Sequence, residues 1–174
     1  MNTSETFLFE KIIFGPVQSR RLGVSLGINL LPNDSKLCNF NCIYCECGWT
    51  EVKNRSGKTF HSRNEVKANL NDSLIHLKEQ KISLDTITFA GNGEPTMHPE
   101  FAKIIDDTIE ARNKYFPNTK IAVLTNATML NRKHVVDALR KVDLKILKLD
   151  AGTEELFQKI NQPLIYKDSL PITY

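Results

Sequence analysis

Ile121-Ala122-Val123-Leu124-Thr125 is the stretch that decides the fold, because it is apolar up to its last residue. A strand of this kind is buried on both faces, as in parallel sheets that are covered by helices. Three more strand-like runs lie at residues 26–31, 85–90 and 144–149, and helix-like segments alternate with them. The sequence therefore predicts an α/β fold with four βα units around a parallel sheet.

The helix-like segments follow the strands in regular order. Asn64 can cap the first, Pro99 opens the second, residues 131–140 form the third, and Thr153 caps the fourth. Right-handed crossovers would curl the sheet into a segment of a barrel or leave it open and doubly wound. In both architectures the loops after the strands build the site. The expected core positions are Val66, Leu70, Leu74 and Leu77 in the first helix, and Phe101, Ile104, Ile105 and Ile109 in the second.

The bulk composition is that of one globular domain. The chain has 174 residues, of which 41% are hydrophobic and 25% charged, and a net charge of +3 is too small to indicate nucleic acid by itself. Residues 1–6 lack the pattern of a signal peptide, and no apolar run is long enough to span a bilayer. We therefore expect a cytoplasmic, reducing environment, where clustered cysteines favour metal or redox chemistry over disulfides.

Three of the four cysteines, Cys38, Cys42 and Cys45, have the spacing C-x3-C-x2-C. Thiolates are natural ligands of iron–sulfur clusters, and a four-iron cubane normally takes four of them. Three closely spaced cysteines can hold three irons and leave the fourth open, just as catalytic zinc sites keep one position for substrate. The spacing therefore predicts a catalytic cluster with one vacant corner.

The fourth cysteine, Cys47, leaves other interpretations open. It could complete a zinc knuckle, or the thiols could be buried for structural reasons alone. Against the zinc knuckle, two residues span more than half of a helical turn, so Cys45 and Cys47 would point to opposite sides. No second cysteine pair lies elsewhere in the chain to complete a zinc ribbon. We predict that Cys47 is not a ligand.

Unusual residues follow the other strands too. Gly91-Asn92-Gly93-Glu94-Pro95 follows the second strand, where its glycines allow close backbone approach and Glu94 offers a carboxylate to an ammonium group. Asn126 follows the third strand and Asp150 the fourth. Each of these has an ordinary alternative as a turn or capping residue. Because the carboxyl ends of parallel strands meet at one edge, we expect these residues to converge on the cysteines, which favours a cluster over zinc.

Together these motifs resemble the radical S-adenosylmethionine (radical SAM) superfamily. The cysteine motif with Tyr44 before its last cysteine, followed by Asn92-Gly93-Glu94-Pro95, carries the resemblance. The segments Phe14-Gly15-Pro16-Val17-Gln18-Ser19-Arg20-Arg21-Leu22-Gly23 and Ser25-Leu26-Gly27-Ile28-Asn29 look like one branch of it, the Fe–S oxidoreductases related to wyosine-base tRNA-modifying enzymes. The resemblance covers residues 14–163.

The resemblance implies cofactors and chemistry. Cys38, Cys42 and Cys45 match the ligands of a [4Fe–4S] cluster whose open iron is chelated by the amino and carboxylate groups of S-adenosylmethionine. An electron from an external donor of flavodoxin or ferredoxin type would split the sulfonium into methionine and a 5′-deoxyadenosyl radical, which abstracts hydrogen from a substrate. RNA is one candidate substrate, and no membrane partner is expected. The implied cofactor contacts are Tyr44 near the adenine, Asn92, Gly93 and Glu94 with Gly91 beside them for the methionine amino group, and Asn126 and Asp150 for the ribose or carboxylate.

Two features depart from the family pattern. Lys148 stands two residues before Asp150, where many branches carry a serine. The family barrel has six βα units, whereas residues 164–174 show no fifth strand. We therefore expect a partial (βα)6 TIM-like barrel in a single domain, residues 1–174, that is truncated at its C-terminus. The truncation keeps an alternative open, a non-catalytic Fe–S or zinc-binding module.

Overall fold

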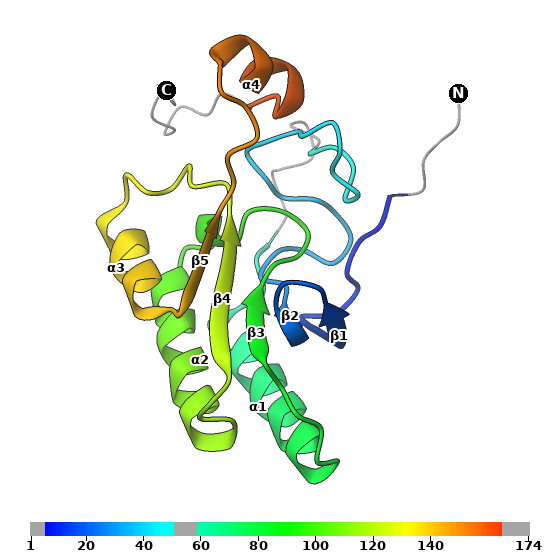
Figure 1. The fold of residues 1–174 in the computed structure, drawn as a ribbon, viewed down its shortest axis with the longest axis vertical. Coiled ribbons are helices and arrows are strands. Elements are labelled where there is room, and N and C mark those ends of the chain that lie inside the picture. The colour runs from blue at the N-terminus through cyan, green and yellow to red at the C-terminus, as the bar shows by residue number, and fades with distance from the viewer. Residues whose placement is uncertain (1–5, 51–58, 165–174) are drawn as a thin grey trace.

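The computed structural model describes residues 6–50 and 59–164, and within them it shows one five-stranded open sheet with the order β1-β2-β3-β4-β5 (Figure 1). The last four strands are parallel, and each of them is followed by an α-helix, which confirms the predicted α/β fold with four βα units. The strands are β1 (Ile13–Ser19), β2 (Gly23–Ile28), β3 (Thr86–Phe89), β4 (Lys120–Thr125) and β5 (Leu144–Leu147).

The first two strands differ from the prediction. Strand β1 is antiparallel to β2 and was not expected, because Gly15 and Pro16 interrupt its pattern and the pairing register shifts between Phe14 and Val17. Strand β2 ends at Ile28, three residues before the end of the predicted run at residues 26–31. The side chain of Asn29 explains the early end, since it bonds both the N–H and the carbonyl of Leu31 and turns the chain.

Helices α1 (Arg63–Glu79), α2 (Phe101–Tyr115) and α3 (Lys133–Lys141) cover one face of the sheet (Figure 1). All of the expected core positions of α1 and α2 are buried except Ile109, which is partly buried. The predicted starts of two helices differ from the structure. Helix α2 begins after Pro99, and Ser62 caps α1 in place of Asn64. Ser62 accepts a hydrogen bond from the Glu65 N–H, and the Glu65 carboxylate accepts one from the Ser62 N–H, which forms a capping box.

Helix α4 (Glu154–Ile160) lies beyond the ends of the parallel strands, where Figure 1 shows it above β4 and β5. Its N-cap is Thr153, as predicted. It packs on the cysteine segment: the rings of Phe157 and Phe40 are 5.3 Å apart, and the Ile43 N–H donates to the Ile160 carbonyl (2.9 Å). In the described part of the chain no helix has the length and apolar character to cross a membrane. Residues 165–174, predicted to hold no strand, lie outside the described residues.

Candidate functional site

The cysteine loop, residues 36–50, lies against the loop that follows β3. The Leu37 N–H donates to the Asn92 carbonyl (2.8 Å), and the Glu94 N–H donates to the Leu37 carbonyl (3.2 Å). Gly93 lies between these bonds with φ at 146°, and a Cβ atom there would come within 1.9 Å of the Leu37 oxygen. Only glycine therefore lets the two loops approach this closely.

Side chains join the cysteine loop to the ends of β4 and β5. Asn126 Nδ2 donates to Asn39 Oδ1 (2.7 Å) after β4, and the Tyr44 hydroxyl donates to the Asp150 carboxylate after β5. Lys148 lies beside the second pair, with its Nζ 3.8 Å from Asp150 and 4.2 Å from the centre of the Tyr44 ring. The structure thus brings the loops of all four parallel strands together, as expected from the sequence.

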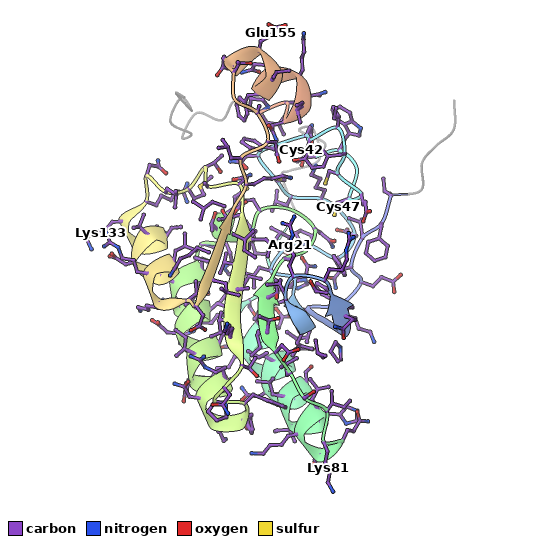
Figure 2. The ribbon with its side chains drawn as sticks, in the orientation of Figure 1. Arg21, Cys42, Cys47, Lys81, Lys133 and Glu155 are labelled. Atoms are coloured by element: carbon purple, nitrogen blue, oxygen red, sulfur yellow. The ribbon has the colours of Figure 1, made fainter. Side chains whose placement is uncertain are left out.

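These loops enclose a cavity of about 490 Å³. Cys38, Cys42 and Cys45 all line it, and Figure 2 shows the cysteine loop above the sheet with Cys42 and Cys47 labelled. Cys47 is not among the lining residues, and its thiol lies 3.7 Å from the Gly91 carbonyl. It also lies close enough to the Cys45 thiol to bond it, so the expectation that these two side chains point to opposite sides was wrong. The other lining residues are Arg21, Lys36, Phe40, Gly91, Gly93, Glu94, Leu124, Thr125, Asn126, Ile146, Leu147, Lys148, Leu149 and Asp150.

The donor set around this cavity fits an iron–sulfur cluster. All four cysteines are free thiols, and three of them face one space. Among residues 6–50 and 59–164 no three His, Cys, Asp or Glu side chains gather as the ligands of one metal ion. In a cubane each thiolate binds a different iron, so its ligands stand around a volume and do not converge on a point.

Nitrogen donors lie near the thiols of Cys38 and Cys42. The Phe40 N–H and Asn126 Nδ2 donate to Cys38 Sγ at 3.4 Å and 3.8 Å. Asn161 Nδ2, at the end of α4, donates to Cys42 Sγ at 3.4 Å. Such bonds stabilise negative charge on sulfur and are one means by which a protein tunes a cluster.

The thiols differ in acidity. Burial raises the pKa of Cys38 to about 12, and the nearby Glu94 carboxylate adds to the effect. A hydrogen bond from the Cys47 thiol, together with the charge of Lys36, lowers the pKa of Cys45 to about 5. Cys45 therefore loses its proton more readily than Cys38, and metal binding requires the deprotonated form of both.

Glu94 is buried, with 2% of its surface exposed, and both of its oxygens already accept hydrogen bonds. Oε1 accepts from the Thr96 N–H (3.1 Å) and from Thr125 Oγ1 (2.7 Å), and Oε2 accepts from the Asn126 N–H (2.7 Å). Burial raises the pKa of this carboxyl. Glu94 thus connects the β3 and β4 loops, and it also faces the cavity.

Asn92 differs from its neighbours in the same motif. Its side chain is fully buried and bonds only main-chain groups: Oδ1 accepts from the Phe9 N–H (2.8 Å), while Nδ2 donates to the carbonyls of Phe9 (2.9 Å) and Pro32 (2.8 Å). It does not line the cavity, whereas Gly91 and Gly93 do. The side chain of Asn92 fixes the framework of the loop.

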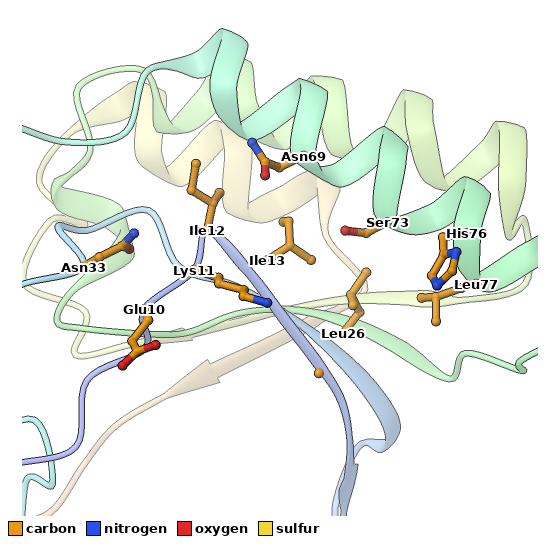
Figure 3. Close-up of a pocket in the computed structure, with 11 residues that line it drawn as sticks. Glu10, Lys11, Ile12, Ile13, Leu26, Asn33, Asn69, Ser73, His76 and Leu77 are labelled. Atoms are coloured by element: carbon orange, nitrogen blue, oxygen red, sulfur yellow. The ribbon is translucent and has the colours of Figure 1, made fainter.

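A second cavity, of about 500 Å³, lies between the segment 10–13 and α1 (Figure 3). Asn69, Ser73 and His76 of α1 point toward that segment. None of the predicted site residues lines this cavity. It is separate from the cysteine site in both position and chemistry.

Three residues of the cysteine site were not identified from the sequence. Asn39 bonds Asn126, Asn161 bonds Cys42, and Lys36 is a buried lysine that lines the cavity. Asn39 directly follows Cys38, so its position in the motif is a usable signal. Asn161 is separated from Cys42 by 119 positions, and a lysine near a motif is usually a solvated residue, so neither gives a local signal.

Comparisons with known proteins give one matching family model and several relatives. A family model described as the radical SAM superfamily matches residues 33–170. Among curated relatives, a protein of Brachyspira hyodysenteriae named GTPase Obg is 36% identical over 162 residues, which is 93% of this chain and 22% of that protein. A UPF0026 protein of Methanocaldococcus jannaschii is 35% identical over 87% of this chain and 44% of its own length. A UPF0026 protein of Helicobacter pylori is 32% identical, with shares of 87% and 46%.

The chain spans about half, or less, of the length of these curated relatives. Among solved structures, a crystal structure of BtrN in complex with AdoMet and 2-DOIA is similar, with a TM-score of 0.45 and 18% sequence identity. The similarity covers 77% of this chain and 48% of that one.

Proposed function

This chain belongs to the radical SAM superfamily, and on that premise we propose that it holds a [4Fe–4S] cluster on Cys38, Cys42 and Cys45 and binds S-adenosylmethionine at the vacant iron. The observation that carries the proposal is the shared cavity, which these three thiols line and Cys47 does not. Arg21, the loop after β3, and the ends of β4 and β5 with their loops supply the rest of its wall, where a cofactor would lie.

The residues of this wall offer a cationic amino acid several partners. Gly91 and Gly93 line the cavity and expose the main chain there, and the Glu94 carboxylate attracts an ammonium group. Asp150 and Asn126 lie at the strand ends, where their polar groups suit a ribose or carboxylate. When bound, the cluster and cofactor supply one-electron cleavage to methionine and a 5′-deoxyadenosyl radical, which serves hydrogen abstraction.

The protein's part in such chemistry is to orient the reactants and to exclude water. The apolar side chains of Leu124 and Ile146, which are register partners on β4 and β5, line the same cavity and serve the second purpose. An external one-electron reductant completes the proposal. We assign no RNA substrate, because none of the relatives reported above is named as an RNA-modifying enzyme.

Anaerobic reconstitution with iron and sulfide tests the proposal. We expect about four irons per chain by the stoichiometry of the cubane, a broad brown absorption that dithionite bleaches, and 5′-deoxyadenosine when S-adenosylmethionine and dithionite are added. The matched control is the chain with all three ligand cysteines changed to alanine. Uptake of zinc in place of iron would contradict the proposal, and a bleachable cluster without 5′-deoxyadenosine would reduce it to a non-catalytic Fe–S module.

A further inference from the structure

Lys36 is the one cation in the wall of the cysteine cavity that is buried in the described structure. Only 4% of its surface is exposed, whereas Arg21 and Lys148, which line the same cavity, are exposed. A buried ammonium group is costly unless a counter-charge lies close to it. The position of Lys36 therefore requires an explanation.

No carboxylate provides that counter-charge within the described residues, where Lys36 takes part in no ion pair. Its ammonium group donates to the neutral carbonyl of Gly48 (2.8 Å) and has two further N–H groups. Lys36 lines the same cavity as the thiols of Cys38, Cys42 and Cys45, which become negative when they bind a metal.

We propose that Lys36 is the built-in counter-charge of the cluster site: its buried ammonium group offsets the negative charge of the cluster-bound thiolates and raises the reduction potential of the cluster. This inference rests on the proposed function. It assigns to Lys36 an effect on the step in which the cluster accepts an electron. In that step one electron passes from the reductant to the cluster, which goes from the 2+ to the 1+ state. A nearby positive charge favours the more negative, reduced state.

A purely structural role makes a different prediction. The bond from Lys36 to Gly48 joins the two ends of the cysteine loop, so its loss alone would loosen the loop and lower iron retention. It would leave the potential of any remaining cluster unchanged. The reduction potential therefore separates the two roles, and iron content by itself does not.

The experiment compares reconstituted wild-type chain with Lys36→Gln, Lys36→Met and Lys36→Arg. Glutamine keeps a hydrogen-bond donor without the charge, methionine keeps the length, and arginine keeps the charge. Lys133→Met, at an exposed lysine of α3 far from the cysteines in Figure 2, controls for the loss of any positive charge. Iron and sulfide content, melting temperature and the midpoint potential are measured without S-adenosylmethionine, the potential by a dithionite titration followed by electron paramagnetic resonance.

We expect the clusters of Lys36→Gln and Lys36→Met to have a more negative potential. At the wild-type midpoint their reduced-to-oxidised ratio should fall about tenfold, which corresponds to about 59 mV for a one-electron couple. Lys36→Arg and Lys133→Met should stay near the wild type. If neither neutral variant keeps a cluster, Lys36 acts in assembling the loop, and the inference about the potential is overturned.

Unchanged potentials in the neutral variants overturn the inference, whether or not their iron content falls. In that case Lys36 is a structural residue of the loop, and the proposed function stands. A wild-type chain that takes up no iron overturns the proposed function, and the inference with it.

Discussion

At the scale of single residues, the members of the motif Asn92-Gly93-Glu94 have two different roles: some hold the loop after β3 in place, and some face the cavity. Asn92 bonds the main chain of Phe9 and Pro32 and holds the loop in place, while Gly93 permits contact with Leu37. Glu94 faces the cavity and also accepts hydrogen bonds from both neighbouring loops. A variant of Glu94 therefore changes both the framework and the proposed ligand contact, and its test needs a control for the framework.

Changing Glu94 to alanine should weaken S-adenosylmethionine binding by about tenfold or more. A charge-assisted hydrogen bond contributes about 1.5–3 kcal/mol, and each 1.4 kcal/mol is about a factor of ten in affinity. Calorimetry on the cluster-loaded chain measures this affinity. Thr125→Val is the control, since it removes one bond to the Glu94 carboxylate and keeps the charge, so it should lower the melting temperature with less effect on affinity. Equal affinity of wild type and Glu94→Ala would assign the residue to the framework alone.

The three cavity-lining cysteines should each be needed for iron retention. We expect Cys38→Ala, Cys42→Ala and Cys45→Ala to lose most of their iron after reconstitution and desalting, because a cubane with two protein ligands is exposed to solvent and exchange. Cys47→Ala should keep wild-type iron and sulfide content, because its thiol does not line the cavity. Comparable iron loss in Cys47→Ala would show that the ligand set is different.

At the scale of the elements, an ion pair joins two helices on the covered face of the sheet. Asp107 of α2 is buried, and its carboxylate accepts from Arg63 Nε (2.6 Å) and Nη2 (2.9 Å) and from Lys67 Nζ (3.1 Å) of α1. These bonds, with the Arg63 hydrogen bonds as the largest cause, hold the pKa of Asp107 below its usual value. The ionised form of Asp107 is therefore stabilised by folding.

The sign of the resulting pH dependence follows from that lowered pKa. A carboxyl group whose pKa is lower in the folded chain stabilises the fold above its unfolded pKa of about 3.9 and loses the contribution as the pH falls through the folded value. We expect Asp107→Asn to be less stable than the wild type at pH 7, and the difference to shrink below about pH 4. Urea denaturation at pH 7 and at pH 3 measures it. Asp72→Asn, at an exposed position of α1 without an ion pair in the described structure, is the control; a difference that is equal at both pH values would contradict the assignment.

At the scale of the whole molecule, the sheet has one weakly covered edge. Among residues 6–50 and 59–164, strand β5 pairs only with β4, and its side chains alternate between partly buried and exposed. Leu147 is 49% exposed and Leu149, just after the strand, is 76% exposed. An unpaired parallel edge with exposed leucines attracts another strand or another chain.

Covering this edge should stabilise the protein. Fusing a designed segment that pairs with β5 to the end of this chain should raise the melting temperature, by about 2–4 °C for each kcal/mol gained at this size. The yield of 5′-deoxyadenosine should rise too. Scanning calorimetry and light scattering compare this fusion protein with a control fusion that carries a Gly/Ser segment of equal length. Identical melting and aggregation of the two fusions would show that the edge needs no cover.

The βα order, the core positions of α1 and α2, and the family could all be predicted from the sequence. These depend on local information: the spacing of apolar residues, the apolar run at 121–125 and the C-x3-C-x2-C motif. The sequence also places the unusual residues after successive strands. Their convergence could be predicted because the ends of parallel strands meet at one edge of the sheet, whatever the conformations of the loops. The sequence did not indicate β1, because a strand interrupted by Gly15 and Pro16 is formed by pairing with β2 and not by its own pattern.

Which side chains of the site face the cavity and which support it depends on the packing of distant segments. Asn92 and Glu94 are two residues apart, yet one is directed into the framework and the other toward the cavity, because their partners come from residues about 30 to 80 positions away. The same holds for Asn161, which reaches Cys42 from the end of α4, and for Lys36, which is buried and donates to the Gly48 carbonyl. Burial and long-range hydrogen bonds are properties of packing, and a local pattern of residues does not encode them.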